Sequence, residues 1–165
     1  MQWDEFSDWG AKISQWAANY HTNLRDRPVR AQTAPGDVAA LIATSAPEGP
    51  HSMNEIMADF ERVVMPGITH WQHPRFFAYF PANAAPPSML AEMLVSTIAA
   101  QCMLWQTSPA ATEMETVMLD WLRQAIGLPE KFSGVIQDSA SSATLAAVLT
   151  MRERALDWQG NQLGL

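Results

Sequence analysis

Apolar side chains recur every three or four positions near the start of the chain, the spacing of one face of an α-helix. We expect a helix over residues 3–24 with an aromatic-rich stripe formed by Trp3, Phe6, Trp9, Ile13, Trp16, Tyr20 and Leu24. An apolar stripe of this length needs a cover. Two alternatives fit the pattern: the stripe packs on the chain's own domain, or it packs on a partner subunit.

Proline and glycine punctuate the next stretch. Residues 25–51 hold few large apolar side chains, so we expect an extended connection with one turn of helix near residues 38–43. Ser52 and Glu55 then have the spacing of a capping box. The apolar face behind them predicts a helix that stops at Pro66 and Gly67.

The segment over residues 67–87 combines aromatic side chains with prolines. Proline removes a backbone donor and fixes φ, so this segment is expected to be an irregular loop. Two roles remain open for its rings: an anchor to neighbouring structure, or the wall of a ligand site. His70 and His73 lie on this loop, and with no third ligand at a suitable spacing they are expected to be hydrogen-bonded histidines and not a metal site.

Two further helices follow. Ser88 is expected to cap a helix over residues 89–104, which is apolar nearly all round and should therefore be buried on most faces. Ser108 and Pro109 form a favoured helix opening, and the helix they begin is expected to close at Gly127.

A change of pattern occurs after residue 132. Val135 and Ile136 predict a short strand, and the hydroxyl-rich run after Asp138 opens an apolar periodic segment, so we expect strand, tight turn and helix. A helix N-terminus of this kind can hold a phosphate or a carboxylate. Alternatively, Asp138 or Ser139 only caps the helix. One strand cannot form a sheet, so the pattern is typical of the front of a longer protein.

Composition and charge exclude several classes of function. The net charge is −7 and the only lysines are Lys12 and Lys131, so no basic patch is available for nucleic acid. The single Cys102 excludes an internal disulfide and suits a reducing cytoplasm. The first residues lack a signal-peptide pattern, and the most apolar stretch, residues 89–105, is too short and too polar for a membrane span.

Several motifs together resemble one enzyme family. They are VVMPGITHW (63–71), HWQHPRFFAYFP (70–81), SPAATEMETVMLDWL (108–122), GLP (127–129) and GVIQDSASSATLAAVL (134–149). In this order and spacing they are similar to the N-terminal third of the group II pyridoxal 5'-phosphate (PLP) decarboxylases, the aromatic-L-amino-acid decarboxylases above all.

The resemblance implies a fold and a domain organisation. The chain would be mainly α. Residues 1–85 would form a helical N-terminal dimerisation segment with an aromatic substrate loop. Residues 86–165 would begin an incomplete PLP-binding large domain of the α/β fold type I, the aspartate aminotransferase-like class.

The resemblance also implies site residues. The cofactor phosphate would be bound by Ser139, Ala140 and Ser141, and the substrate side chain by Trp71, Tyr79, Phe80, Pro81 and Met103. In family dimers the segment that holds Gln101 and Met103 enters the partner's active site. Three positions depart from common family residues: Ala82 replaces a threonine, Asp138 a glycine and Met103 an aromatic residue. The preferred aromatic substrate therefore stays open.

The implied function is conversion of aromatic L-amino acids to amines and CO₂ through a Schiff-base intermediate in a cytoplasmic homodimer. The family's Schiff-base lysine is expected in a C-terminal part, because neither Lys12 nor Lys131 matches its motif. No catalytic residue is therefore assigned to this chain, and the isolated 165 residues are not expected to decarboxylate a substrate. The alternative is a non-catalytic helical dimerisation or binding module derived from that family.

Overall fold

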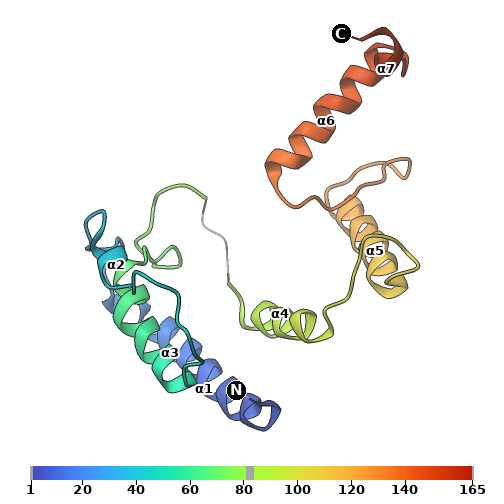
Figure 1. Ribbon diagram of the computed structural model, residues 1–165. Helices are drawn as coiled ribbons and strands as arrows, with labels where there is room; N and C mark the ends of the chain where they lie inside the picture. The colour runs from blue at the N-terminus through green and yellow to red at the C-terminus, as the bar shows by residue number, and fades with distance from the viewer. Residues whose placement is uncertain (1, 81–83, 165) are drawn as a thin grey trace. The chain divides into compact units, whose positions relative to one another are not determined.

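The computed structural model describes residues 2–80 and 84–164, and its chain divides into two units, Met1–Leu90 and Ala91–Leu165. Figure 1 shows the helices in chain order. The described residues contain helices and loops but no strand, which agrees with the expected mainly α chain.

Among the described residues, the first unit contains three complete α-helices, α1 (Trp3–Thr22), α2 (Asp37–Ala40) and α3 (Met53–Asp59), and the first residues of a fourth. A short 3₁₀ turn, Leu24–Asp26, follows α1. A π-helical stretch, Phe60–Val64, and a 3₁₀ turn, Met65–Gly67, continue α3. The helices expected at residues 3–24 and after Ser52, and the single turn near residues 38–43, are therefore confirmed.

The capping box at the start of α3 is formed as the sequence predicts. Ser52 Oγ accepts a hydrogen bond from the Glu55 N–H (3.3 Å), and the Glu55 carboxylate accepts one from the Ser52 N–H (2.7 Å). The same contacts with Ser52 lower the pKa of the Glu55 carboxyl. Two backbone donors of the first turn are satisfied in this way.

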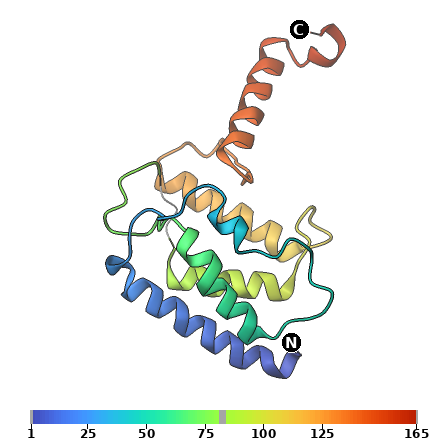
Figure 2. The ribbon, with the colours of Figure 1, turned by 60° about the vertical axis from the view of Figure 1, so that its left-hand side comes forward.

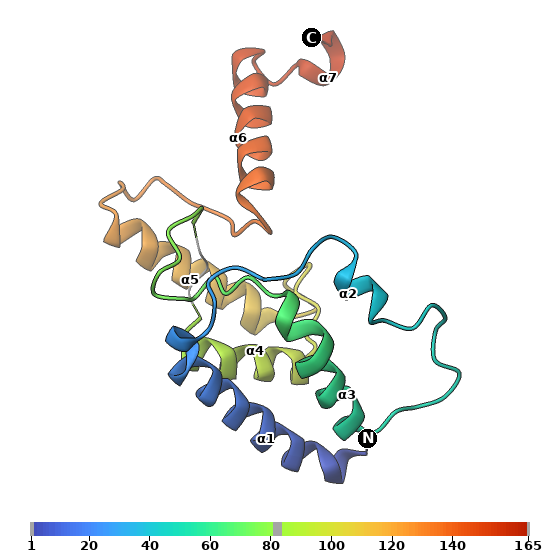
Figure 3. The same cartoon turned by 90° about the vertical axis from the view of Figure 1, so that its left-hand side faces the viewer.

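Helix α1 lies beside α3 and its π-helical continuation (Figures 2 and 3). The Trp16 ring stacks on Tyr20 with centroids 5.4 Å apart and meets the edge of Phe60 at 5.3 Å. Trp16 Nε1 also donates a hydrogen bond to the Glu61 carboxylate. The C-terminal half of the aromatic stripe is therefore covered by the chain's own unit.

The N-terminal half of the same stripe is only partly covered, because Phe6 and Trp9 are half-buried. Trp3 is 83% exposed, and Ile13 is also exposed. By contrast, Leu24 at the other end of the stripe is buried together with Val63 and Met65. The chain's own domain therefore packs on one half of the stripe. Packing of a partner subunit on the other half stays a prediction.

The second part of the chain contains α4 (Pro86–Ile98), α5 (Pro109–Ala125), α6 (Ala140–Ala155) and α7 (Gly160–Leu163). Helix α5 begins at Pro109 as expected, although the hydroxyl of Ser108 makes no capping hydrogen bond. Gly127 follows α5 with φ +74°, a left-handed conformation that suits glycine after a helix end.

Two details of α4 differ from the prediction. The helix begins three residues before Met89 and ends at Ile98, and Ser88 lies inside its first turn, where Ser88 Oγ bonds to the backbone of Ala85. Its apolar side chains are also exposed, with Ile98 at 72%. The expectation of a helix buried on most faces is wrong for this chain, because the described residues do not cover those faces.

The strand expected at Val135 and Ile136 is likewise absent from the described residues, where both side chains are exposed. Extended residues form a strand only when a neighbouring strand completes the hydrogen-bond ladder. No such neighbour exists among residues 2–80 and 84–164, so this segment remains an extended loop that leads into α6.

The chain exposes an unusually large surface, 13828 Å². Two separate folded domains of these lengths would together expose roughly 9,800 Å². Many large apolar side chains on α4, α5 and α6 are exposed. Among the described residues, no helix is both long enough and apolar enough to cross a membrane.

Candidate functional site

The aromatic loop of the first unit is anchored at its base and open at its tip. His70 and His73 are each 3% exposed, and the His70 N–H donates to the Val29 carbonyl at 2.9 Å. Trp71 lies between the two histidines in sequence. Its ring packs on Phe76 with centroids 4.9 Å apart and stacks on Tyr79 at 5.6 Å.

The predicted substrate residues Trp71 and Tyr79 are thus brought together. Tyr79 is 83% exposed and has φ +54°, the left-handed region that a residue with a Cβ rarely adopts. Phe80 is 99% exposed, so its ring meets nothing within the described chain. Pro81 and Ala82 lie outside the described residues. The loop presents rings to solvent and buries its polar base.

The two buried histidines have hydrogen-bond partners, as the sequence predicts. His73 Nδ1 accepts from the Arg75 N–H (3.0 Å), which leaves Nε2 as the donor to the Arg25 carbonyl (3.3 Å). His70 Nδ1 lies 2.8 Å from the Tyr20 hydroxyl. Burial lowers the pKa of His70, and the nearby Arg27 and His73 lower it further.

A metal site is not apparent near these histidines. Within residues 2–80 and 84–164, no group of three His, Cys, Asp or Glu side chains is placed to hold a metal ion. His70 and His73 instead use their ring nitrogens to fix the base of the loop.

The start of α6 carries the predicted anion-binding residues. Ser139 is the N-cap, and its Oγ accepts from the Ser142 N–H at 3.3 Å. The capping role proposed for Ser139 is therefore confirmed. The amides of Ala140 and Ser141 and the Ser141 hydroxyl form no hydrogen bond within the described residues. Capping by Ser139 therefore leaves two amides and one hydroxyl free at the positive end of the helix.

These free donors suit a phosphate monoester. The two amides belong to the first turn of a helix of 16 residues, and residues 139–141 are all exposed. Backbone N–H groups at a helix N-terminus point at an anion placed there, and serine adds a hydroxyl donor. The donor set therefore fits a phosphate that approaches from solvent.

Met103 lies on the loop between α4 and α5 and is 74% exposed. Like Phe80, it has a large apolar side chain with little contact in this chain. Gln101 is exposed on the same loop. The structure leaves both side chains accessible to other groups.

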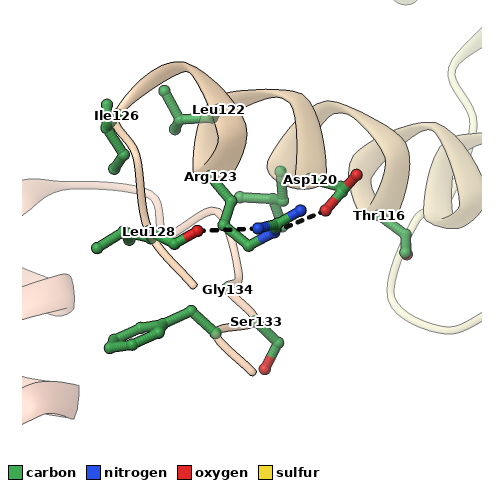
Figure 4. Close-up of a pocket in the computed structure, with 10 residues that line it drawn as sticks. Thr116, Asp120, Leu122, Arg123, Ile126, Leu128, Ser133 and Gly134 are labelled. Carbon is green, nitrogen blue, oxygen red and sulfur yellow. Dashed lines mark hydrogen bonds and ion pairs between the residues drawn. The ribbon is translucent and has the colours of Figure 1, made fainter. Parts of the chain in front are cut away.

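A groove that the sequence did not indicate lies beside α5 (Figure 4). It has a volume of about 410 Å³ between the C-terminal half of the helix and residues 128–134. Arg123 donates to Asp120 Oδ1 (2.7 Å) and to the Leu128 carbonyl (2.9 Å). Hydrogen bonds from Arg123 and Gln124 lower the pKa of Asp120. Arg123 thus ties the loop after α5 to the helix.

Comparison with known proteins identifies relatives along nearly the whole chain. Aromatic-L-amino-acid decarboxylase of Cavia porcellus is 44% identical over 164 residues, which cover 94% of this chain and 34% of the relative. The enzyme of the same name from Manduca sexta is 43% identical over 92% of this chain and 32% of its own length. This chain therefore spans about a third of the curated relatives it matches.

Solved structures give the same picture. Tryptophan decarboxylase of Catharanthus roseus, in complex with L-tryptophan, matches with a TM-score of 0.90 and 34% identity over 97% of this chain and 35% of that one. The 4-hydroxyphenylacetaldehyde synthase of Rhodiola rosea matches with a TM-score of 0.90 and 33% identity over 98% of this chain and 36% of that one. The expected fold class is therefore confirmed.

The family model described as the pyridoxal-dependent decarboxylase conserved domain matches residues 35–160. That range contains the base of the aromatic loop, the loop after α4 and the N-terminus of α6. The resemblance inferred from the motifs is confirmed, and this chain belongs to the pyridoxal-dependent decarboxylase family.

Proposed function

We propose that this chain is the N-terminal part of a PLP-dependent decarboxylase that converts aromatic L-amino acids to amines and CO₂. The observation that carries the proposal is the 44% identity to an aromatic-L-amino-acid decarboxylase over 94% of this chain. Because the chain spans about a third of that relative, the activity is assigned to a protein that includes a C-terminal part with the lysine. No catalytic residue is assigned here.

The cofactor phosphate is assigned to Ser139, Ala140 and Ser141. The free amides of Ala140 and Ser141 and the free Ser141 hydroxyl support this assignment, while Ser139 keeps the helix end in place. The helix dipole adds partial positive charge at the same point. When bound, PLP supplies an electron sink for the charge left on the substrate by loss of CO₂.

The substrate side chain is assigned to the aromatic loop. Trp71 and Tyr79 already stack on one another, and Phe80, which follows Tyr79 in sequence, is almost fully exposed. Pro81 and Met103 complete the proposed set. Aromatic rings prefer offset-stacked or edge-to-face neighbours, so a group of rings of this kind suits an aromatic substrate.

The proposed assembly is a homodimer. Residues 1–85 act as the dimerisation segment and residues 86–165 as the start of the PLP-binding large domain. The exposed side chains of Trp3 and Ile13 on the α1 stripe support a partner's contact there. The proposed partners are the aromatic substrate, the C-terminal part and a second copy, with no nucleic acid and no membrane.

The alternative is a non-catalytic dimerisation or binding module. It is favoured by one observation, the exposed surface of 13828 Å², which would suit a chain that only binds other polypeptides. Such a module would keep the helices of the family for binding and would not form amines.

The experiment that separates the two functions starts from the purified protein that contains this chain. The sample is incubated with PLP and reduced with borohydride, and the intact mass of every polypeptide is measured. CO₂ and amine are measured in a separate, unreduced portion of the same PLP-loaded sample with tryptophan, tyrosine, phenylalanine and DOPA, against histidine and glutamate. We expect a reduced cofactor adduct and amine from the aromatic substrates. An unmodified sample without amine would favour the module, and an aldehyde in place of the amine would contradict simple decarboxylation.

A further inference from the structure

Tyr20 near the end of α1 meets the base of the aromatic loop fifty residues later in the chain. Its hydroxyl oxygen lies 2.8 Å from His70 Nδ1, and the two rings have centroids 5.6 Å apart. His70 is 3% exposed. Burial raises the pKa of Tyr20 and lowers that of His70, so both groups are neutral near pH 7 and one hydrogen bond joins them.

The rest of the loop base is attached to the backbone of residues 25–31, where the Ala31 N–H also donates to Thr69 Oγ1 at 3.3 Å. The His70 N–H donates to the Val29 carbonyl at 2.9 Å, and His73 Nε2 donates to the Arg25 carbonyl at 3.3 Å. Trp71 lies between these two attachment points and stacks on Tyr79. The backbone of Trp71 is therefore flanked on both sides by attached residues, His70 and His73.

Only one of these attachments depends on a side-chain hydroxyl from α1. Tyr20 is itself fixed, because its ring stacks on Trp16 at 5.4 Å and carries the Arg27 guanidinium 5.2 Å from its centroid. A fixed tyrosine can transmit the position of α1 to the loop through a single hydrogen bond. An exposed polar contact would not act in this way, since water would replace it.

We propose that Tyr20 is a positioning residue, whose hydrogen bond to His70 sets the orientation of the Trp71 and Tyr79 rings toward the substrate. The role in substrate binding rests on the proposed function. The role in fixing the loop rests on the contacts alone. Tyr20 touches neither substrate nor cofactor in this assignment, so its effect is on binding geometry.

The test uses Tyr20→Phe in the full-length protein. Phenylalanine keeps the ring contacts with Trp16 and Arg27 and removes only the hydroxyl. We expect amide hydrogen exchange over residues 71–80 to become about two- to tenfold faster, with α1 and α3 unchanged. In turnover assays the KM for the aromatic amino acid should rise about two- to tenfold while kcat changes less than about twofold.

A matched control is Thr22→Val, which removes a hydroxyl from the same helix. Among the described residues, Thr22 Oγ1 donates only to the Ala18 carbonyl within α1, so exchange in the loop should stay at the wild-type rate. His70→Asn, which keeps a hydrogen-bonding atom near the Nδ1 position, should lie closer to wild type than His70→Leu.

Three exchange results would each overturn the proposal: unchanged exchange over residues 71–80 in Tyr20→Phe, equal acceleration in Thr22→Val, or acceleration throughout the first unit. A fall in kcat at unchanged KM would also contradict it. The proposed function is tested separately, because its failure would appear as the absence of amine from the wild-type protein. The hydrogen-exchange measurement would still decide whether Tyr20 fixes the loop.

Discussion

The backbone N–H of Ile136 donates a 2.8 Å hydrogen bond to Oε1 of Glu115, which lies on α5 twenty-one residues earlier. Gly134 approaches the same helix so closely that an added Cβ would lie 3.3 Å from Leu119 Cδ2. These contacts hold the extended loop along α5 and set the direction from which the chain enters α6. Within the described residues, the segment that leads to the proposed phosphate donors is therefore held by a carboxylate.

Glu115→Ala should loosen this loop. The variant removes the acceptor of the Ile136 N–H, and a net hydrogen-bond contribution of about 1 kcal/mol corresponds to roughly fivefold faster exchange of that amide. Hydrogen exchange over residues 132–138 measures the effect. Glu130→Ala is the control, since Glu130 lies on the same loop and makes no hydrogen bond within the described residues. Equal rates in the two variants would contradict the role of Glu115.

Ser139→Ala should lower the stability of the protein, whereas Ser141→Ala should weaken PLP binding. Ser139 caps α6, so its loss should lower the free energy of unfolding by about 1 kcal/mol. Ser141 has no such contact, so its loss should leave stability unchanged and weaken PLP binding by about 1.5–3 kcal/mol, the range for a hydrogen bond to a charged group. PLP titration of the full-length protein and urea unfolding measure the two effects. An unchanged PLP dissociation constant in Ser141→Ala would count against the phosphate assignment.

Features that depend on neighbours in sequence were predicted well. The capping box of Ser52 and Glu55 and the start of α5 at Pro109 are examples, since their hydrogen bonds or backbone preferences involve residues within one helical turn. The capping role of Ser139 belongs to the same group.

Features that depend on distant segments were predicted poorly. The β-branched pair Val135 and Ile136 has strand propensity but no partner strand in the described chain, and the apolar faces of α4 have no cover there. The contact between Tyr20 and His70 spans fifty residues, and no local pattern marks it. The substrate and cofactor roles came from family motifs, because local chemistry alone favoured capping over anion binding at the start of α6.

Lowering the pH from 7.5 to 5.5 should destabilise the first unit. Burial lowers the pKa of His70 below its ordinary value of 6.5, with further lowering by Arg27 and His73. Below pH 6.5 the unfolded chain therefore binds the proton more readily than the folded one, so stability falls as pH decreases through this window. Urea midpoints followed by tryptophan fluorescence measure the change.

His70→Asn is the control for this pH dependence, because it removes the titrating group. Its urea midpoint should vary less between the two pH values than that of the wild-type protein. The carboxyls of Glu55 and Asp120 do not account for the window, since their ordinary pKa values, 4.5 and 3.8, lie below it and both are lowered further. Identical pH dependence in the two proteins would contradict the assignment to His70.

Gly67→Ala should destabilise the first unit through one steric contact. A Cβ at Gly67 would lie 2.8 Å from Val38 Cγ2, and a β-branched side chain has few rotamers with which to withdraw. Replacement of glycine by alanine also stabilises a protein by about 0.4–1 kcal/mol, because it lowers the conformational entropy of the unfolded chain, so the cost of the clash must be measured against that gain.

Gly49→Ala supplies the reference, because nothing lies within 4 Å of its Cβ position. We expect Gly67→Ala to be less stable than Gly49→Ala by about 1–3 kcal/mol in urea unfolding, the range for an overpacked site. Equal stabilities would mean that α2 moves away from Met65–Gly67 at no cost, and the packing between these two segments would then contribute little to the fold.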